Sequence, residues 1–139
     1  MTFELDTKLN RDIARRDKLI FGGYDQSKYC GGVRRFECNV DLMKQLIKEG
    51  FADPDECQND SPFIKDFMDT VDGDESVRFE CYAVDINRDD YRVTIEGIRA
   101  YIPDTDYDRI NLYVEQFRYA DEFTFEHMDD CFYLRAWWA

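Results

Sequence analysis

Alternating apolar and polar residues in the second half of the chain predict two β-hairpins. The first spans residues 76–102 and has a four-residue loop at 87–90, which places Val84 opposite Val93. Beyond Gly97 the apolar positions move to the other side of both strands, and this change predicts a bend or a β-bulge at that glycine. We therefore expect one long hairpin whose tip and base bury opposite faces.

The second hairpin lies close to the end of the sequence and has the same form. Its predicted loop again contains four residues, 127–130, so that Phe125 lies opposite Phe132. Each register also brings an acidic residue opposite an arginine, and such pairs stabilise adjacent strands. The predicted pairs are Asp85 with Arg92 and Glu122 with Arg135.

Apolar residues at helical spacing predict three helices around the hairpins. Asn39 is the expected N-cap of a helix over residues 40–50, and Ser61, followed by a proline, is the expected N-cap of a helix over residues 62–71. The third helix is expected at residues 107–119, where carboxylates near the first turn complement the helix dipole.

A strand at residues 33–38 completes the predicted order β-α-α-β-β-α-β-β. This order is typical of an α+β fold, in which an antiparallel sheet of about five strands packs with three helices. We expect residues 33–139 to form a single compact acidic domain. Residues 1–32 contain two glycine pairs and a short helical pattern at 8–18, which indicates a basic N-terminal arm or an irregular segment.

The net charge of the chain narrows the class of partner. Thirty-one acidic and 18 basic residues give a net charge of −13. Residues 1–35 hold 8 basic and 5 acidic residues, a net charge of +3, so the remainder carries −16. Such a field opposes binding to a nucleic-acid backbone or an anionic membrane and favours a basic protein surface. The alternative is that the charge serves solubility alone.

The basic N-terminal segment is the one part of the chain whose charge would allow direct contact with nucleic acid. The same charges are more typical of a solvated terminus, so we expect no direct contact with nucleic acid elsewhere. The five cysteines form no CxxC motif, and the sequence has neither a leader nor an apolar run of membrane-spanning length. These features predict a cytoplasmic protein with reduced thiols and no contact with a membrane.

No catalytic or cofactor-binding signature is present in the sequence. The glycine pairs do not form a phosphate-binding pattern, and the GxSxG and HExxH motifs are missing. The single histidine, His127, falls in a predicted tight loop, and nothing in the sequence pairs it with a cysteine nucleophile. We therefore expect a protein that is not an enzyme and that needs no cofactor.

One acidic stretch matches part of a calcium-binding loop. Asp104, Asp106, Asp108 and Glu115 stand at positions 1, 3, 5 and 12 of such a loop. The sixth position is Arg109, although the sharp turn requires glycine there, and helical spacing continues through the segment. The pattern therefore fits an acidic helix N-terminus better than a metal site.

The carboxylates expected at the surface gather at hairpin loops and helix starts. If the two hairpins share one sheet, their loops should align along one edge. Carboxylates in rows on a rigid frame can imitate nucleic-acid phosphates and occupy a channel lined by Lys and Arg. The residues expected to contact a partner in this way are Asp89, Asp90, Asp104, Asp106, Asp108, Asp129 and Asp130.

Trp137 and Trp138 are the remaining candidates for partner binding, because tryptophan at an interface often contributes much of the binding energy. Alternation along the strand turns one of them inward and one outward. The alternative is therefore that one tryptophan completes the core and the other covers an edge of the sheet.

In size and acidity the chain resembles the small inhibitors carried by phages and mobile genetic elements, the anti-CRISPR and anti-restriction proteins. The resemblance is one of type and confers no site residues. It implies a non-enzymatic inhibitor that occupies the basic channel of a nucleic-acid enzyme such as a Cas nuclease. The alternatives are a cytosolic adaptor or immunity-type protein, whose charge serves solubility, and a small metal-dependent enzyme.

Overall fold

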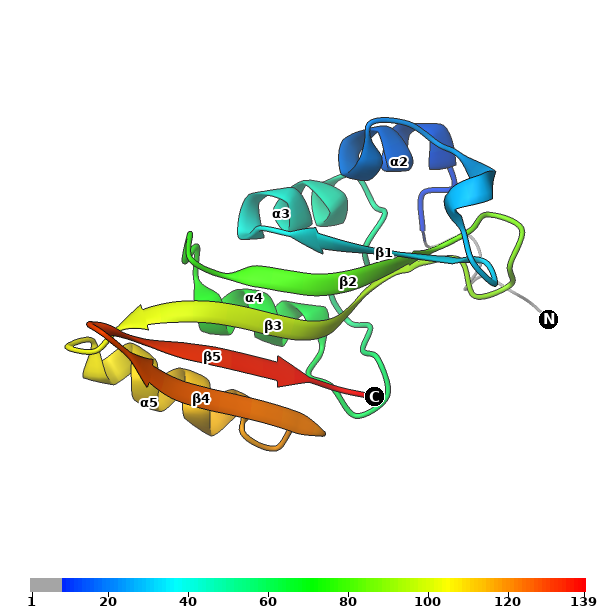
Figure 1. The fold of residues 1–139 in the computed structure, drawn as a ribbon. Coiled ribbons are helices and arrows are strands. Elements are labelled where there is room, and N and C mark those ends of the chain that lie inside the picture. Colours follow the sequence, from blue (N-terminus) through cyan, green and yellow to red (C-terminus); the bar gives the residue numbers. More distant parts are fainter. Residues whose placement is uncertain (1–8) are drawn as a thin grey trace.

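A computed structural model describes residues 9–139, which contain four α-helices and a five-stranded antiparallel sheet (Figure 1). The predicted α+β class is confirmed, with one helix more than expected. The sheet has the order β1-β2-β3-β5-β4 and consists of β1 (Val33–Cys38), β2 (Arg78–Val84), β3 (Val93–Pro103), β4 (Glu122–Met128) and β5 (Cys131–Trp137). The helices are α2 (Ile13–Phe21), α3 (Val40–Lys48), α4 (Ile64–Val71) and α5 (Tyr107–Phe117).

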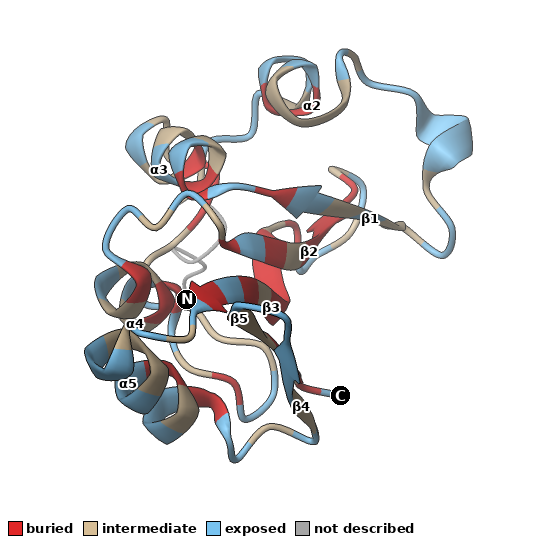
Figure 2. Cartoon of the chain, turned by 60° about the vertical axis from the view of Figure 1, so that its left-hand side comes forward, coloured by how far each residue is buried: buried red, intermediate tan, exposed pale blue. Residues whose placement is uncertain are grey.

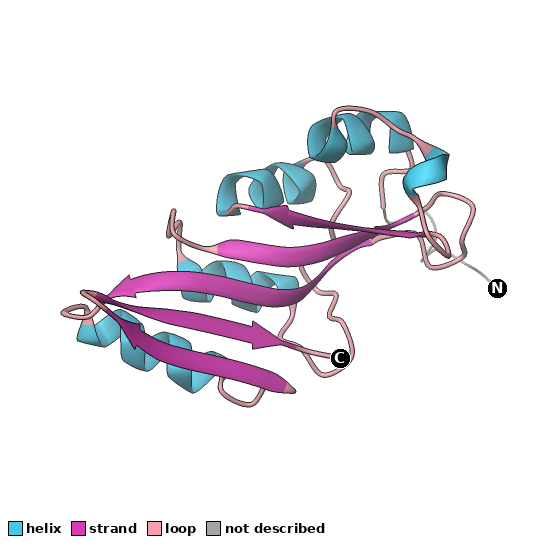
Figure 3. Ribbon diagram, viewed as in Figure 1, coloured by secondary structure: helices cyan, strands magenta, loops and turns pink. Residues whose placement is uncertain are grey.

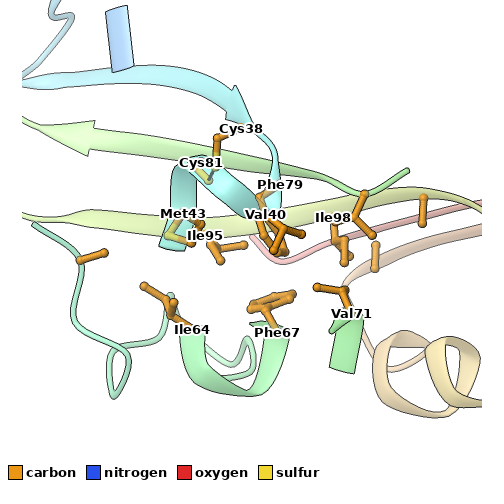
Figure 4. Close-up of a cluster of buried hydrophobic side chains, with 14 of the residues drawn as sticks. Cys38, Val40, Met43, Ile64, Phe67, Val71, Phe79, Cys81, Ile95 and Ile98 are labelled. Carbon is orange, nitrogen blue, oxygen red and sulfur yellow. Dashed lines mark hydrogen bonds between the residues drawn. The ribbon is translucent and has the colours of Figure 1, made fainter. Parts of the chain in front are cut away.

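Helices α3, α4 and α5 lie on one side of the sheet, which we call the helix face (Figure 3). The other side, the open face, is not covered by any helix of the described residues, and buried residues concentrate between the sheet and the helices (Figure 2). Phe67 of α4 points into this core (Figure 4) and is completely buried. Its ring lies 5.9 Å from that of Phe79, 5.6 Å from that of Phe117 and 5.5 Å from that of Trp138.

The helix starts agree with the sequence at two of three places. The Asn39 side chain caps α3 by accepting a hydrogen bond from the amide of Leu42 at 2.8 Å. Asp106, one of the carboxylates before the third predicted helix, caps α5. The predicted cap at Ser61 is wrong, because α4 starts later and Phe63 is its N-cap. The hydroxyl of Ser61 instead accepts a hydrogen bond from a backbone amide in the preceding loop.

The first hairpin, β2–β3, contains the expected bulge, but its tip has another register. At the base Phe79 lies opposite Ile98 as predicted. The pairing then shifts by one residue, which leaves Glu96 as the extra residue of β3, and Val93 lies opposite Ala83 rather than Val84. Val84 and Val93 therefore face opposite sides of the sheet. The helix face stays apolar along the whole of β3, and the predicted exchange of buried faces between tip and base is wrong.

This shift also separates the predicted pair of Asp85 and Arg92. Strand β2 ends before Asp85 and strand β3 begins after Arg92, so the connection between them is longer than the four residues expected. Asp85 is buried and accepts hydrogen bonds from the hydroxyl of Tyr24 and the amide of Ile86. Arg92 pairs with Asp90 at 3.0 Å. The cross-strand ion pair that the sequence predicts is therefore replaced by other partners.

The second hairpin, β4–β5, turns more tightly than predicted. Met128 lies opposite Cys131, so the loop contains only Asp129 and Asp130, and Asp129 adopts a left-handed conformation with φ of 47°. Phe125 consequently lies opposite Leu134 instead of Phe132, although its ring stacks on that of Phe132 with centroids 4.6 Å apart. The shift is of two residues, and each side chain therefore keeps its predicted face.

Glu122 and Arg135 illustrate the effect of the two-residue shift. They are no longer directly opposite, because Glu122 lies opposite Trp137. They nevertheless remain on the same face and approach to 3.8 Å across the strands. The predicted ion pair is present as a diagonal contact.

The basic N-terminal segment is packed against the domain over its described part, residues 9–32, while residues 1–8 lie outside the described part. Helix α2 carries a buried ion pair between Arg16 and Asp17. The Arg16 guanidinium also donates to the carbonyl of Val84 at 2.9 Å and lies 4.8 Å from the ring centroid of Tyr91. These contacts connect α2 to the tip of the β2–β3 hairpin.

All five cysteines are free, as the sequence predicts. Two of them, Cys38 on β1 and Cys81 on β2, are buried with their sulfur atoms 3.8 Å apart. Burial raises the pKa of the Cys81 thiol, and the contact with Cys38 adds to this effect. Among residues 9–139 no helix has both the length and the apolar character needed to cross a membrane.

Candidate functional site

Three loops that are distant in the sequence meet at one end of the sheet. These are the loop after α4, the connection from β3 to α5, and the two-residue turn between β4 and β5 (left side of Figure 1). The amide of Asp104 donates to the carbonyl of Asp130 at 3.0 Å, which joins the second loop to the third. The Arg109 guanidinium of α5 reaches Asp74 at 3.2 Å and joins the second loop to the first.

Carboxylates dominate this end of the sheet, which we call the acidic end. Five of the seven predicted aspartates belong to it, together with three acidic residues of the loop after α4 that the sequence analysis did not single out. Its members are Asp72, Asp74, Glu75, Asp104, Asp106, Asp108, Asp129 and Asp130. The first three and Asp106 and Asp108 line an open hollow of about 710 Å³ between α4 and α5.

A small number of polar contacts fix the geometry of the acidic end. Asp106 caps α5 and also pairs with the Arg109 guanidinium at 3.1 Å. Asp74 is almost buried and accepts a hydrogen bond of 2.8 Å from the Tyr113 hydroxyl. Burial of Tyr113, and its hydrogen bond to Asp74, raise the pKa of the tyrosine, so its hydroxyl remains a donor. The loop after α4 is thereby held against α5.

Other carboxylates of the acidic end point into solvent. Asp108, Asp129 and Asp130 are exposed and form no ion pair with any residue of the described part. Asp104 lies 3.1 Å from the Nε2 atom of His127, which sits on β4 and not in a loop as predicted. The end of the sheet therefore presents unpaired negative charge on a backbone fixed by the strands and by α5.

The sequence-based alignment of the two hairpin loops along one edge is wrong. Asp89 and Asp90 precede the first residue of β3, whereas the β4–β5 turn lies beside its last residue, Pro103. The 11 residues of β3 span about 33 Å at the usual rise of an extended strand. The two aspartate pairs are thus at opposite ends of the sheet.

Asp90 differs from the acidic end in its charge environment as well. It pairs with Arg88 at 2.8 Å and with Arg92 at 3.0 Å. Partial burial opposes ionisation of the Asp90 carboxyl, but the hydrogen bond from Arg92 and the nearby Arg88 charge outweigh it and lower its pKa. Asp90 is therefore a structural partner of two arginines, and only Asp89 beside it is free to act as an exposed charge.

The two tryptophans face opposite sides of the sheet, as alternation requires. Trp138 is buried on the helix face against Phe67 and Phe117, so it is a core residue and cannot contact a partner. Trp137 is half-buried on the open face, and its indole N–H donates to Glu96 at 3.2 Å. It lies on β5 between β3 and β4 and therefore covers no edge of the sheet.

The four residues of the calcium pattern do not converge. Asp106 is engaged by the amide and the guanidinium of Arg109, and Glu115 lies about two turns further along α5. Within residues 9–139 there is no group of three or more His, Cys, Asp or Glu side chains placed to hold a metal ion. The segment is an acidic helix N-terminus.

The open face carries a network of ion pairs that the sequence analysis missed. Arg135 of β5 forms a bidentate pair with Glu80 of β2, at 2.8 and 2.9 Å, across the intervening β3. Arg99 of β3 contacts Glu37 and Glu80, and Arg35 of β1 pairs with the buried Glu96 at 3.0 Å. A correct register would have placed these side chains on one face. The network neutralises much of the charge on this surface.

The cations of the N-terminal segment are also engaged. Arg15 pairs with Glu49 at 2.9 Å, and Phe21 of α2 contacts the guanidinium of Arg34 on the adjoining β1, 3.7 Å from the ring centroid. Arg11 donates to the backbone carbonyl of Ile86. Together with the buried Arg16, these contacts use most of the arginine charge of this segment to attach it to the domain.

Comparisons with known proteins identify no relative. No family model matches the chain, and neither a curated protein nor a solved structure is similar to it.

Proposed function

We propose that this protein is a non-enzymatic binding protein whose acidic end occupies a basic, nucleic-acid-binding channel of an enzyme, as inhibitors of the anti-CRISPR type do. The observation that carries the proposal is the convergence of carboxylates from three loops on one end of the sheet. Two arginines contact this end within residues 9–139: Arg109 is paired with Asp74 and Asp106, and Arg78 donates to the backbone carbonyl of Glu75. A Cas nuclease is one candidate partner.

The physical basis is electrostatic complementarity. A channel that binds nucleic acid is lined by Lys and Arg, and exposed carboxylates such as Asp108, Asp129 and Asp130 would take the place of phosphates. Their positions are held by a strand, a helix and a tight turn, so little ordering is needed when the surfaces meet. Asp89 and Asp90 lie too far away to belong to the same contact surface.

The experiment is capture of partners on the immobilised protein, followed by elution with duplex DNA or RNA. If the acidic end occupies a nucleic-acid channel, a captured protein should be released by the nucleic acid, because both compete for one site. The purified partner should then lose its nucleic-acid binding when this protein is added. Association with the partner should also slow steeply as the salt concentration rises from about 50 to 500 mM. Salt screens the attraction between the acidic end and the basic channel of the partner.

Two charge variants distinguish the effect of where the carboxylates lie from the effect of the net charge of the protein. The test variant replaces Asp104, Asp106, Asp108, Asp129 and Asp130 by Asn. The control carries the same number of Asp→Asn changes at positions away from the acidic end, and its positions are Asp12, Asp25, Asp60, Asp66 and Asp89. Circular dichroism checks first that both variants are folded.

We expect the test variant to associate at least about tenfold more slowly than the control, because opposite charges mainly accelerate encounter. Equal rates for the two variants, or a partner that nucleic acid fails to release, would contradict channel occupation. The charge would then be attributed to solubility, and an adaptor role with Trp137 as the next residue to test would replace the proposal.

A further inference from the structure

The outer edge of β4 is an unpaired strand edge. Strand β4 pairs with β5 over its whole length, and no other strand of the described part lies on its far side (Figure 1). Its outward backbone N–H and C=O groups are therefore free to accept another strand. Such an edge is a ready template for pairing with a second chain.

Apart from two glutamates, this edge lacks the features that usually prevent pairing between proteins. The seven residues of β4 keep a continuous register with β5, without a bulge, and they include no lysine and no proline. The opposite edge strand, β1, is different, because α2 lies beside it. The ring of Phe21 from α2 packs edge-to-face on Phe36 at 5.6 Å and also contacts Arg34.

The side chains of β4 alternate in chemistry between the two faces. On the helix face Phe123 and Phe125 are only half-buried, and their rings stack in a row that continues to Phe132. On the open face Glu126 is exposed and lies opposite Tyr133 in the neighbouring strand. Glu122, on the same face, has 65% of its side chain exposed and makes only the long 3.8 Å contact to Arg135.

We propose that β4 is a docking edge for an extended segment of a basic partner, in which Lys or Arg alternates with apolar residues. The added strand would place its cations beside Glu122 and Glu126 and its apolar side chains beside Phe123 and Phe125. The inference rests on the proposed function only in that both require a basic partner. The surface is a different one, running from the acidic end along the side of the sheet.

Charge argues against a second copy of this chain as the occupant. Two copies joined edge to edge would each bring a net charge of −13 and would place two acidic β4 strands side by side. A basic strand would instead be attracted by the negative charge of the protein and of β4. The partner chemistry therefore follows from the charge of the edge as well as from its hydrogen-bonding capacity.

The test uses a synthetic peptide, so it does not depend on identifying the natural partner. The probe is a fluorescent seven-residue peptide with alternating Lys and Val. The comparison peptide has the same composition with all lysines in one block. At a fixed salt concentration, fluorescence anisotropy should give a Kd about tenfold lower for the alternating peptide, because only that peptide matches both faces of β4.

Two further arms identify the mode of binding. N-methylation of alternate residues in the peptide should abolish binding in one of the two possible sets and spare it in the other, because only one set donates hydrogen bonds to β4. Glu122→Lys with Glu126→Lys should weaken binding of the alternating peptide more than Asp89→Lys with Glu115→Lys, a control pair with the same charge change at exposed positions outside β4 and the acidic end. Circular dichroism checks that both variants are folded.

Equal affinity for the two peptides, or equal losses in the two charge variants, would overturn the proposal and leave only non-specific attraction. If sedimentation shows a dimer that Glu126→Lys disrupts, the occupant of the β4 edge is a second copy of this chain and the proposal is overturned. Neither result bears on the acidic end, which is tested by its own variants. Failure of the docking edge is thus distinguishable from failure of the proposed function.

Discussion

Arg16 and Asp17 are neighbours in the chain and form an ion pair of 2.9 Å whose side chains are both completely buried. The hydroxyl of Tyr29 lies between them, accepting from Arg16 and donating to Asp17. This hydroxyl stays protonated, because burial and the contact with Asp17 raise the pKa of Tyr29. The cluster holds the N-terminal helix on the tip of the β2–β3 hairpin.

Replacing Arg16 by Met should lower the free energy of unfolding by about 3–5 kcal/mol, because Asp17 would remain buried without its counter-charge. Urea unfolding followed by circular dichroism measures the change. The double variant with Asp17→Leu should recover part of the loss, since neither charge is then left alone. Lys18→Met, at an exposed position of the same helix, is the control and should move the midpoint much less. Equal midpoints for the two single variants would show that the buried pair has no special role.

Two phenylalanines between the sheet and the helices, Phe67 of α4 and Phe125 of β4, should differ in their contribution to stability. Phe67 is completely buried among three aromatic rings, and Phe67→Ala should cost about 3–5 kcal/mol. Phe125 is only half-buried, so Phe125→Ala should cost clearly less than Phe67→Ala. The sequence alone predicts similar losses for both. A common urea midpoint for the two variants would show that β4 is packed more tightly than its exposure indicates.

Acid should destabilise the protein partly through Glu49. Hydrogen bonds from Arg15 and Gln45 lower the pKa of Glu49 to about 2. In an unfolded chain a glutamate titrates near about 4.3, so below that pH the unfolded chain binds a proton that the folded protein does not. The stability that Glu49 contributes is therefore complete above about pH 4.3 and is lost as the pH falls towards 2.

Glu49→Gln should consequently be less stable than the wild type at pH 7 and should lose less stability between about pH 5 and 2. Urea unfolding at several pH values measures both effects. Glu115→Gln, a change at an exposed position of α5, is the control and should follow the wild-type profile. Parallel pH profiles for Glu49→Gln and the wild type would refute the assignment.

Gly97 should not tolerate a side chain, because the strands approach closely at the bulge. A Cβ atom built there would lie 3.0 Å from the carbonyl oxygen of Ala136 and 3.1 Å from Cδ1 of Trp137. Gly97→Ala should therefore cost about 1–3 kcal/mol through displacement of β5. Gly23→Ala, at a glycine whose Cβ would meet nothing within 4 Å, is the control and should be close to neutral. Unchanged thermal unfolding of the Gly97 variant would indicate that β5 yields easily.

The sequence predicts most elements of the fold, because caps and apolar stripes are local signals. It predicts the registers less well. For β4–β5, a four-residue and a two-residue loop put Phe125 on the same face, and the hydrophobic pattern cannot distinguish them. For β2–β3, residues 81–85 are all buried, so alternation disappears where the register shifts. The bulge at Glu96 is marked only by the glycine that follows.

The candidate site is harder to predict because it depends on the order of strands. Nothing in the sequence indicates that β5 lies between β3 and β4, and this order decides that the β4–β5 turn meets the end of β3. The net charge of the sequence gives the sign of the surface potential. It does not show that Asp90 is paired with two arginines whereas Asp130 is exposed to solvent. Which charges remain free is a property of the tertiary structure.

The position of β5 between β3 and β4 determines the order in which the sheet can assemble during synthesis. When β4 leaves the ribosome, the strand that will separate it from β3 has not yet been made, and β4 has no neighbour to pair with. The nascent chain can form the β1–β2–β3 sheet, but the two parts of the sheet join only when β5 inserts between them. An aromatic, acidic edge strand is exposed until then, so the interval before β5 emerges is the period in which a nascent chain is most open to incorrect strand pairing.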